Sequence, residues 1–203
     1  LIGFKAHTQT TVTSLSDLMR YLDDDNVNVK LASGTYNISA SDIDNGTYGQ
    51  LLSGDIIGDQ YSLFLFQGDN STYDFTGVTI NIDTEVLSAF GNVSFHELQI
   101  IGSNNVLSNL TMVDSGDADN FPGRSATNIV IDGANNRIEG FHVTIKGSYP
   151  YGYGDIFGKS GTNVISHKKH SACLVRGDSN QVVNSTFIHR AYGHGIFFQG
   201  AND

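Results

Sequence analysis

The sequence has little of several residue types that would otherwise point to a class of protein. Tryptophan is absent, proline occurs twice, and only 16% of the 203 residues are charged. The single cysteine, Cys173, excludes an intrachain disulfide and any zinc site built on paired cysteines. No apolar run approaches the ~20 residues of a membrane-spanning helix, so we expect no membrane partner.

Negative charge dominates the chain but is distributed unevenly. The formal net charge is −10, yet residues 1–120 hold 3 Lys/Arg against 16 Asp/Glu, and residues 121–203 hold 8 against 5. So acidic a chain is a poor nucleic-acid binder, and we expect no nucleic-acid partner. Its basic part can attract a smaller anion locally. The alternative is an uneven scatter of surface charge.

Residues that form turns and strands are abundant, and they recur with a period. Asparagine occurs 18 times and glycine 23 times, and an alignment on five glycines reveals a repeat with spacings of 34, 31, 44 and 23 residues. Apolar residues recur two and four positions before each glycine. Asparagine recurs three positions after three of them. The glycines are Gly68, Gly102, Gly133, Gly177 and Gly200, and the asparagines are Asn105, Asn136 and Asn180.

This repeat predicts an all-β protein, a right-handed parallel β-helix that forms a single domain over residues 1–203. Apolar residues at alternate positions would face a continuous core. Small polar residues at the corners, asparagine above all, would stack from coil to coil. A β-sandwich also uses many short strands, but it has no reason to repeat the same offsets.

The two ends of the repeat differ. Residues 14–24 have apolar residues at helical spacing after Ser14 or Ser16, which predicts a short N-terminal helix that caps the open end of the β-helix. At the other end, Gly200 starts a coil that stops at Asp203. We therefore expect C-terminal coils to be missing, or to lie on a second chain that continues the stack.

Extra residues enter the repeat at one place, after the strand that lies ten positions beyond the glycine. Loops of variable length on one side of a solenoid commonly form its binding face. Lys146 and Arg190 occupy equivalent positions next to these insertions on adjacent coils. Two cations so close repel each other unless an anion lies between or beside them. The longest insertion, residues 147–170, gathers further candidates: Tyr149, Tyr151, Tyr153, Lys159, His167, Lys168, Lys169 and His170.

These residue types suit an acidic polysaccharide. Tyrosine rings stack on sugar faces, and Arg or Lys pairs with carboxylates. The matching reaction is β-elimination, in which a cation neutralises the uronate carboxylate, a base removes the neighbouring C5 proton and an acid protonates the leaving oxygen. The alternative, a glycoside hydrolase, needs a carboxylate pair. The basic part offers few carboxylates: Asp132, Glu139, Asp155, Asp178 and Asp203.

Several stretches resemble a known family. The N-terminal helix pattern, "LASGTYNI" and the Asn-rich coils resemble the pectate-lyase-like superfamily of right-handed parallel β-helices over nearly the whole chain. Within it, "GSYPYGYGDIFGKSG" together with "HRAYGHGIFFQG" is similar to β-helical polysaccharide lyases of alginate-lyase type. The resemblance implies a secreted or periplasmic lyase acting on an alginate-like polymer. Uronan C5-epimerases share the fold, but their Asp-Pro-His-Asp signature is absent.

The resemblance also implies roles for individual residues, since many such lyases pair a Lys base with an Arg acid. The catalytic candidates are Lys168, Arg190, His194 and Tyr153. The substrate-binding candidates are Lys146, Tyr149, Tyr151, Lys159, His167 and His170. We expect no required cofactor and no metal ligand among them.

Two alternatives stay open. "DSGDADN" at 114–120 has the alternating acidic residues of calcium loops, although it lacks a complete EF-hand pattern, and some lyases of this type use calcium. A non-catalytic β-helix, such as a carbohydrate-binding module or adhesin, would show aromatic and polar binding residues without a focused set of titratable ones. The gathering of His, Lys, Arg and Tyr favours an enzyme.

Overall fold

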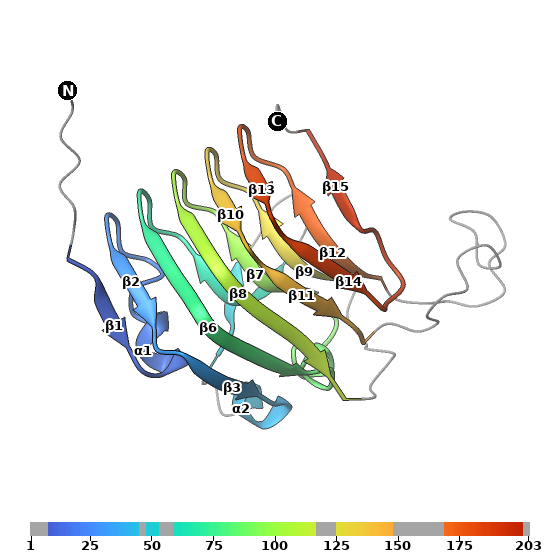
Figure 1. Ribbon diagram of the computed structural model, residues 1–203. Helices are drawn as coiled ribbons and strands as arrows, with labels where there is room; N and C mark the ends of the chain where they lie inside the picture. The colour runs from blue at the N-terminus through green and yellow to red at the C-terminus, as the bar shows by residue number, and fades with distance from the viewer. Residues whose placement is uncertain (1–7, 45–47, 53–58, 117–124, 148–168, 201–203) are drawn as a thin grey trace, which may run out of the picture.

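The computed structural model describes residues 8–44, 48–52, 59–116, 125–147 and 169–200. These residues are mostly β-structure, arranged in two sheets. All strand pairs are parallel except β4 with β5. Figure 1 shows that the strands of successive repeats lie side by side in chain order, from β2 to β13 in one sheet. The prediction of an all-β protein is therefore confirmed.

The first sheet follows the order β1 (Thr10–Val12), β2 (Asn28–Leu31), β6 (Thr72–Asp83), β8 (Val106–Ser115), β10 (Arg137–Glu139) and β13 (Gln181–Val183). Three more strands extend it: β3 (Gly34–Ile38) pairs with β6, and β11 (His142–Ile145) pairs with both β8 and β14 (Thr186–His189). The second sheet follows the order β15 (Ile196–Phe198), β12 (His170–Val175), β9 (Ala126–Ile131), β7 (Ser94–Ile100), β5 (Gln60–Phe66) and β4 (Gln50–Leu52).

The register between strands reproduces the offsets of the sequence repeat. The apolar residues four positions before the glycines pair in one line across the second sheet: Phe64, Leu98, Ile129, Cys173 and Ile196. The first four of these are buried in a core that both sheets share with Leu15 and Leu18 of α1 (Leu15–Met19). At the β15 edge, Ile196 and Phe198 are exposed.

Four of the five aligned glycines lie in equivalent corners. A Cβ built on Gly102 would lie 2.1 Å from the Gly68 carbonyl oxygen, and one on Gly133 would lie 1.8 Å from that of Gly102. Gly177 meets Gly133 in the same way, at 2.0 Å. These positions require glycine because backbones of neighbouring repeats approach too closely for any side chain. Gly200 does not: it has a φ of +76° and no neighbour within 4 Å, so its predicted equivalence is wrong.

The three asparagines form one continuous ladder, as predicted. Asn136 donates from Nδ2 to the Gly102 carbonyl oxygen at 2.9 Å, and its Oδ1 accepts from the Asn105 backbone N–H at 2.9 Å. Asn105 and Asn180 each repeat this pattern with the turn of the repeat before them. The ladder satisfies buried backbone groups that no strand pairing reaches.

Asparagine also serves a second purpose at the corners. A left-handed backbone conformation recurs two positions after each glycine of the column, and asparagine tolerates it better than most residues do. The φ angles lie between 56° and 60° at Asn70, Asn104, Asn135 and Ser179. The high asparagine content thus follows from two geometrically distinct requirements of one repeat.

The N-terminal helix is shorter than the predicted 14–24. Helix α1 covers Leu15–Met19, and its N-cap is Ser14, whose hydroxyl accepts from the Asp17 backbone N–H at 3.0 Å. After Met19 the chain continues in turns, in which the backbone N–H groups of Arg20 and Tyr21 donate to the carbonyl oxygens three residues before them. Two further short helices are α2 (Ala40–Asp44) and α3 (Val86–Ala89).

Candidate functional site

The two inserted segments leave and rejoin the sheets at the same end of the strands. Strand β8 ends at Ser115 before residues 117–124, and β9 begins at Ala126. Strand β11 ends at Ile145 before residues 148–168, and β12 begins at His170. Since β8 pairs with β11 and β9 with β12, the described ends of both insertions meet in one region.

Four of the ten predicted site residues lie in the described part of the chain: Lys146, His170, Arg190 and His194. The other six lie outside the described residues: Tyr149, Tyr151, Tyr153, Lys159, His167 and Lys168.

Lys146 and Arg190 are neighbours across two adjacent repeats. The last paired residues of β11 and β14 are Ile145 and His189, and the Arg190 backbone N–H continues the ladder by donating to the Ile145 carbonyl oxygen at 2.8 Å. Since Ile145 is fully buried, the next residue along each strand faces outward. Arg190 is exposed, and its guanidinium forms no ion pair with any described carboxylate. Lys146 donates from Nζ to the Gly116 carbonyl oxygen at 2.8 Å.

His194 lies in the segment that joins β14 to β15. Its carbonyl oxygen accepts from the Ala172 backbone N–H at 2.8 Å, and its own N–H donates to the Ser171 hydroxyl at 3.2 Å. The imidazole packs against the Phe197 ring with centroids 4.8 Å apart. His194 thus extends the second sheet, whereas Arg190 extends the first.

Gly193 and Gly195 flank His194 and differ in their surroundings. A glycine beside a site residue can let a ligand or another chain segment approach the backbone closely. A Cβ on Gly193 would lie 2.4 Å from the His170 carbonyl oxygen, so the close approach is that of the protein's own β12. Gly195 has no neighbour within 4 Å and remains open.

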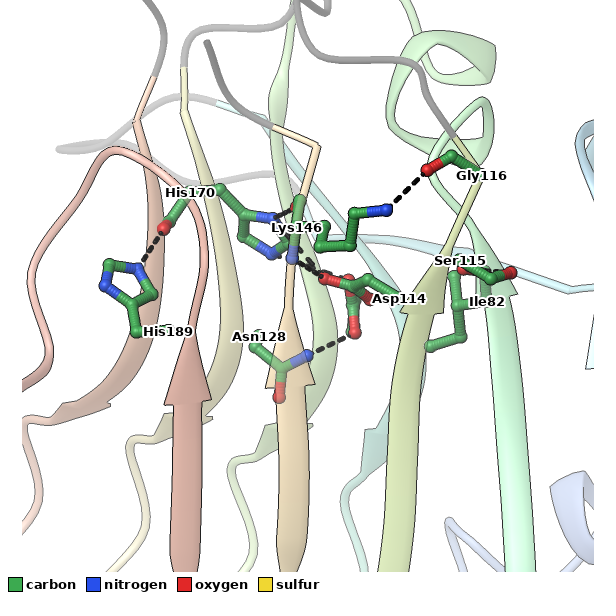
Figure 2. A network of polar contacts seen from close by, with 9 residues as sticks. Ile82, Asp114, Ser115, Gly116, Asn128, Lys146, His170 and His189 are labelled. Atoms are coloured by element: carbon green, nitrogen blue, oxygen red, sulfur yellow. Dashed lines mark hydrogen bonds and ion pairs between the residues drawn. The ribbon is translucent and has the colours of Figure 1, made fainter. Parts of the chain in front are cut away.

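His170 is not at the surface, where the sequence analysis placed it as a substrate-binding residue. Its side chain is completely buried, because His170 opens β12 and its ring turns toward the first sheet. Nδ1 forms a short hydrogen bond with the Lys146 carbonyl oxygen (Figure 2). Nε2 lies 3.4 Å from Glu97 Oε1. In this position the imidazole cannot touch a polymer.

Two carboxyl groups share this buried position with His170. Glu97 on β7 and Asp114 on β8 are 1% and 3% exposed. Asp114 Oδ2 accepts from the Lys146 backbone N–H at 2.7 Å, and Glu97 Oε2 accepts from the Asn128 side-chain amide. Figure 2 shows Asp114, Asn128 and His170 converging, with the His189 ring hydrogen-bonded to the His170 carbonyl oxygen at 2.9 Å.

Burial controls the ionisation of this cluster. Loss of solvation raises the pKa of Glu97 to about 7, although a hydrogen bond with Asp114 opposes the rise. Burial, followed by the negative charge of Glu97, raises the pKa of Asp114 well above its ordinary value. Burial lowers the pKa of His170, against the opposing pull of Asp114. The imidazole is therefore neutral at neutral pH, and the two carboxyl groups cannot both be charged without a cation.

The sequence contains a signal for this cluster that the repeat analysis did not use. Asp114 lies in register with Ile82 on β6, and Glu97 occupies the column position of Leu63 on β5. Both acids therefore stand where neighbouring repeats place aliphatic core residues. Such a substitution is costly unless the group is paired or binds a ligand.

Two of the carboxylates that the basic part of the sequence offered to a glycoside hydrolase, Asp132 and Glu139, are engaged in ion pairs. Asp132 binds Arg176 through both oxygens, the longer contact being 2.8 Å, and also accepts from Gln99. Glu139 pairs with Arg137 at 3.0 Å. Glu97 and Asp114 are too deeply buried to reach a sugar.

Comparison with protein-family models and with curated proteins identifies no relative of this chain. No protein-family model matches it, and no curated protein is significantly similar to it. Among the described residues, no helix combines the length and apolar character needed to cross a membrane.

Proposed function

We propose that this protein is a polysaccharide lyase that cleaves an anionic, alginate-like uronic-acid polymer by β-elimination. The placement of Lys146 beside Arg190, both facing outward on adjacent strands, carries the proposal. The two backbones lie roughly 5 Å apart at this point, so the Arg190 guanidinium and the Lys146 ammonium can reach the same space when Lys146 leaves the Gly116 carbonyl oxygen, and they would repel each other there. A carboxylate bound between them relieves the repulsion, and a uronan supplies one on every sugar.

The proposal includes the finer architecture. We take the two sheets to be faces of a right-handed parallel β-helix, a single domain over residues 1–203 with α1 as its N-terminal cap. The constant register, the glycine column and the asparagine ladder support this assignment. They are what a stack of equivalent coils requires.

In this mechanism the cations bind the substrate carboxylate and make the adjacent C5 proton more acidic. A base removes that proton, the C4–O bond breaks, and an acid delivers a proton to the leaving oxygen while a C4–C5 double bond forms. Arg190 binds the carboxylate or protonates the leaving oxygen. His194, Lys168 and Tyr153 are the base candidates. The substrate would come from outside the cell, which fits a secreted or periplasmic protein.

The product distinguishes this proposal from its rivals. Purified protein is incubated with alginate, pectate and glucuronan, and the ultraviolet absorbance of the unsaturated uronate is followed. Elimination produces that absorbance, whereas a hydrolase releases reducing ends without it. A C5-epimerase changes the sugar configuration without cleavage, and a binding module or adhesin retains the polymer unchanged. Absence of unsaturated product from all three polymers would refute the lyase assignment.

Variants at the described site test the residues. Arg190→Ala is expected to lower turnover about 10²–10³-fold, the usual effect of losing one transition-state contact. Arg20→Ala is the matched control, because Arg20 is an exposed arginine of the N-terminal cap whose one ion pair among the described residues is a 3.6 Å contact with Asp17. Unchanged turnover in Arg190→Ala and in His194→Ala, at unchanged melting temperature, would remove this site from the mechanism.

A further inference from the structure

The buried cluster of Glu97, Asp114 and His170 has the organisation of a metal site. One potential ligand atom from each residue lies within 4.8 Å of those of the other two. The side chains come from three strands, β7, β8 and β12, that belong to both sheets. All three are buried, so solvent cannot satisfy them.

Hydrogen bonding fixes the orientation of the imidazole. The Lys146 carbonyl oxygen can only accept, so His170 Nδ1 carries the proton and Nε2 presents a lone pair. Nε2 has no hydrogen-bond partner, and neither has Glu97 Oε1, which lies 3.4 Å away. Two acceptors facing each other in a buried space need either a proton or a metal ion between them. Ligands of a tetrahedral zinc ion, each about 2.1 Å from the metal, lie about 3.4 Å apart.

In both Glu97 and Asp114 the two carboxyl oxygens have different surroundings. One oxygen is held by an outer contact: Glu97 Oε2 by the Asn128 amide, and Asp114 Oδ2 by the Lys146 backbone N–H. The other oxygen of each, Glu97 Oε1 and Asp114 Oδ1, is buried and has no hydrogen-bond partner when both groups are ionised. Metal sites show this arrangement, in which outer hydrogen bonds orient the ligands and leave the inner atoms for the ion.

The donor atoms indicate the class of metal. One imidazole nitrogen and two carboxylate oxygens suit Zn²⁺ and related divalent transition metals, whereas Ca²⁺ prefers six to eight oxygens. Asn128 turns its amide nitrogen toward Glu97 and its oxygen away from the cluster, so it orients the carboxyl group (Figure 2). The two negative carboxylates balance the charge of a divalent ion.

We propose that Glu97, Asp114 and His170 bind one divalent transition-metal ion, zinc or a close relative, in a closed structural site. The ion would join the two sheets where both inserted segments meet them, since Asp114 lies near the end of β8 and His170 opens β12. It would thereby hold the described ends of those segments in place, independently of the proposed catalysis.

The test measures metal binding and stability rather than activity. The full chain is purified, its metal content is determined by mass spectrometry, and it is refolded in chelator. Zn²⁺, Mn²⁺ and Ca²⁺ are then titrated separately while binding and melting temperature are recorded. We expect one Zn²⁺ or Mn²⁺ per chain and a higher melting temperature, with little response to Ca²⁺. If wild-type protein neither binds nor is stabilised by either transition metal, the proposal is overturned. The buried acceptors of the cluster would then share a proton in place of a metal ion.

A matched pair of variants locates the ion. Glu97→Gln keeps the shape and hydrogen-bond acceptor but removes the charge, and we expect Zn²⁺ affinity to fall about 100-fold or more. His96→Gln is the control, because His96 is a buried histidine on the same strand that contacts Gln99 rather than the cluster. Equal Zn²⁺ binding by Glu97→Gln and wild type would overturn the assignment. If Glu97→Gln does not fold, the visible spectrum of Co²⁺-loaded wild type decides: tetrahedral N/O bands support the site, and octahedral bands of free Co²⁺ refute it.

Discussion

At the scale of single residues, the glycine column is the strictest constraint in the chain. A Cβ at Gly133 would overlap the Gly102 carbonyl oxygen, and backbone on both sides prevents either atom from moving away. We expect Gly133→Ala to lower the free energy of unfolding by about 3 kcal/mol, in the upper range for overpacking a rigid site. Chemical denaturation measures the change.

Gly34→Ala is the control for that substitution. Its Cβ would meet only the Tyr36 ring, at the ordinary contact distance of 3.9 Å. We expect a change within about 0.5 kcal/mol. Similar losses in both variants would show that the backbones are not in contact at the column.

Cys173 is the second residue-scale case. It lies in the core line of the second sheet, completely buried, and burial raises the pKa of its thiol to about 12. The thiolate is the reactive form, so we expect negligible modification by a maleimide at neutral pH in the folded protein and complete modification in denaturant. Mass spectrometry separates the two. Rapid labelling of the native protein would place Cys173 outside the core.

At the scale of elements, the asparagine ladder joins one repeat to the next. Asn136→Ala removes two hydrogen bonds and leaves the Gly102 carbonyl oxygen and the Asn105 N–H without side-chain partners in a buried turn. We expect the free energy of unfolding to fall by about 3 kcal/mol. Asn81→Ala, whose side chain makes an exposed 2.9 Å bond to Asn37, should change it by less than about 0.5 kcal/mol. Equal losses in the two variants would show that the ladder hydrogen bonds stabilise the fold no more than an exposed side-chain hydrogen bond does.

Strands β2 and β6 are joined by a salt bridge that predicts a pH dependence. Lys30 Nζ lies 2.8 Å from Asp74 Oδ2. Burial alone would raise the pKa of Asp74, but hydrogen bonds from Lys30 and Thr76 outweigh it and lower the pKa. The bridge therefore stabilises the fold above the ordinary aspartate pKa of about 3.9, and this contribution is lost as pH falls through the lower folded value.

Comparison of wild type with Asp74→Asn tests this dependence. The difference in free energy of unfolding should be largest near neutral pH and should shrink below about pH 4. Urea titrations across that range measure it, with Lys30→Met as the partner variant. A difference that grows as pH falls would contradict the assignment.

At the scale of the whole molecule, the repeat could be predicted from the sequence because the same structural requirement acts at the equivalent position of several repeats. Leu98, Ile129 and Cys173 share an offset from a glycine, and that offset became their register. The prediction for Gly200 was wrong, because a glycine belongs to the column only when backbone of the preceding repeat lies against it. The predicted helix length was wrong too, because hydrophobic spacing does not distinguish an α-helix from the turns in which the chain continues after Met19.

The candidate site was less predictable. The pairing of Lys146 with Arg190 followed from counting along the repeat, as each lies thirteen residues after its glycine. The burial of His170 did not, because a residue at the end of an insertion has no fixed offset from the glycine before it. Glu97 was missed, and Asp114 was placed in a calcium-binding loop at 114–120, whereas it is buried in the core and residues 117–120 lie outside the described residues. The two acids come from separate strands, and their convergence depends on how the two sheets close on each other.

The asparagine ladder also gives the stack a direction. Each of the three asparagine side chains forms its hydrogen bonds with backbone groups of the preceding repeat. Asn180 bonds to the turn that contains Asn136, Asn136 to the turn that contains Asn105, and Asn105 to the turn that contains Ser71. The backbone groups of a turn therefore gain these hydrogen bonds only when the following repeat is in place. Because translation runs from the N-terminus, the turn of one repeat can receive these hydrogen bonds only after the next repeat has been synthesised.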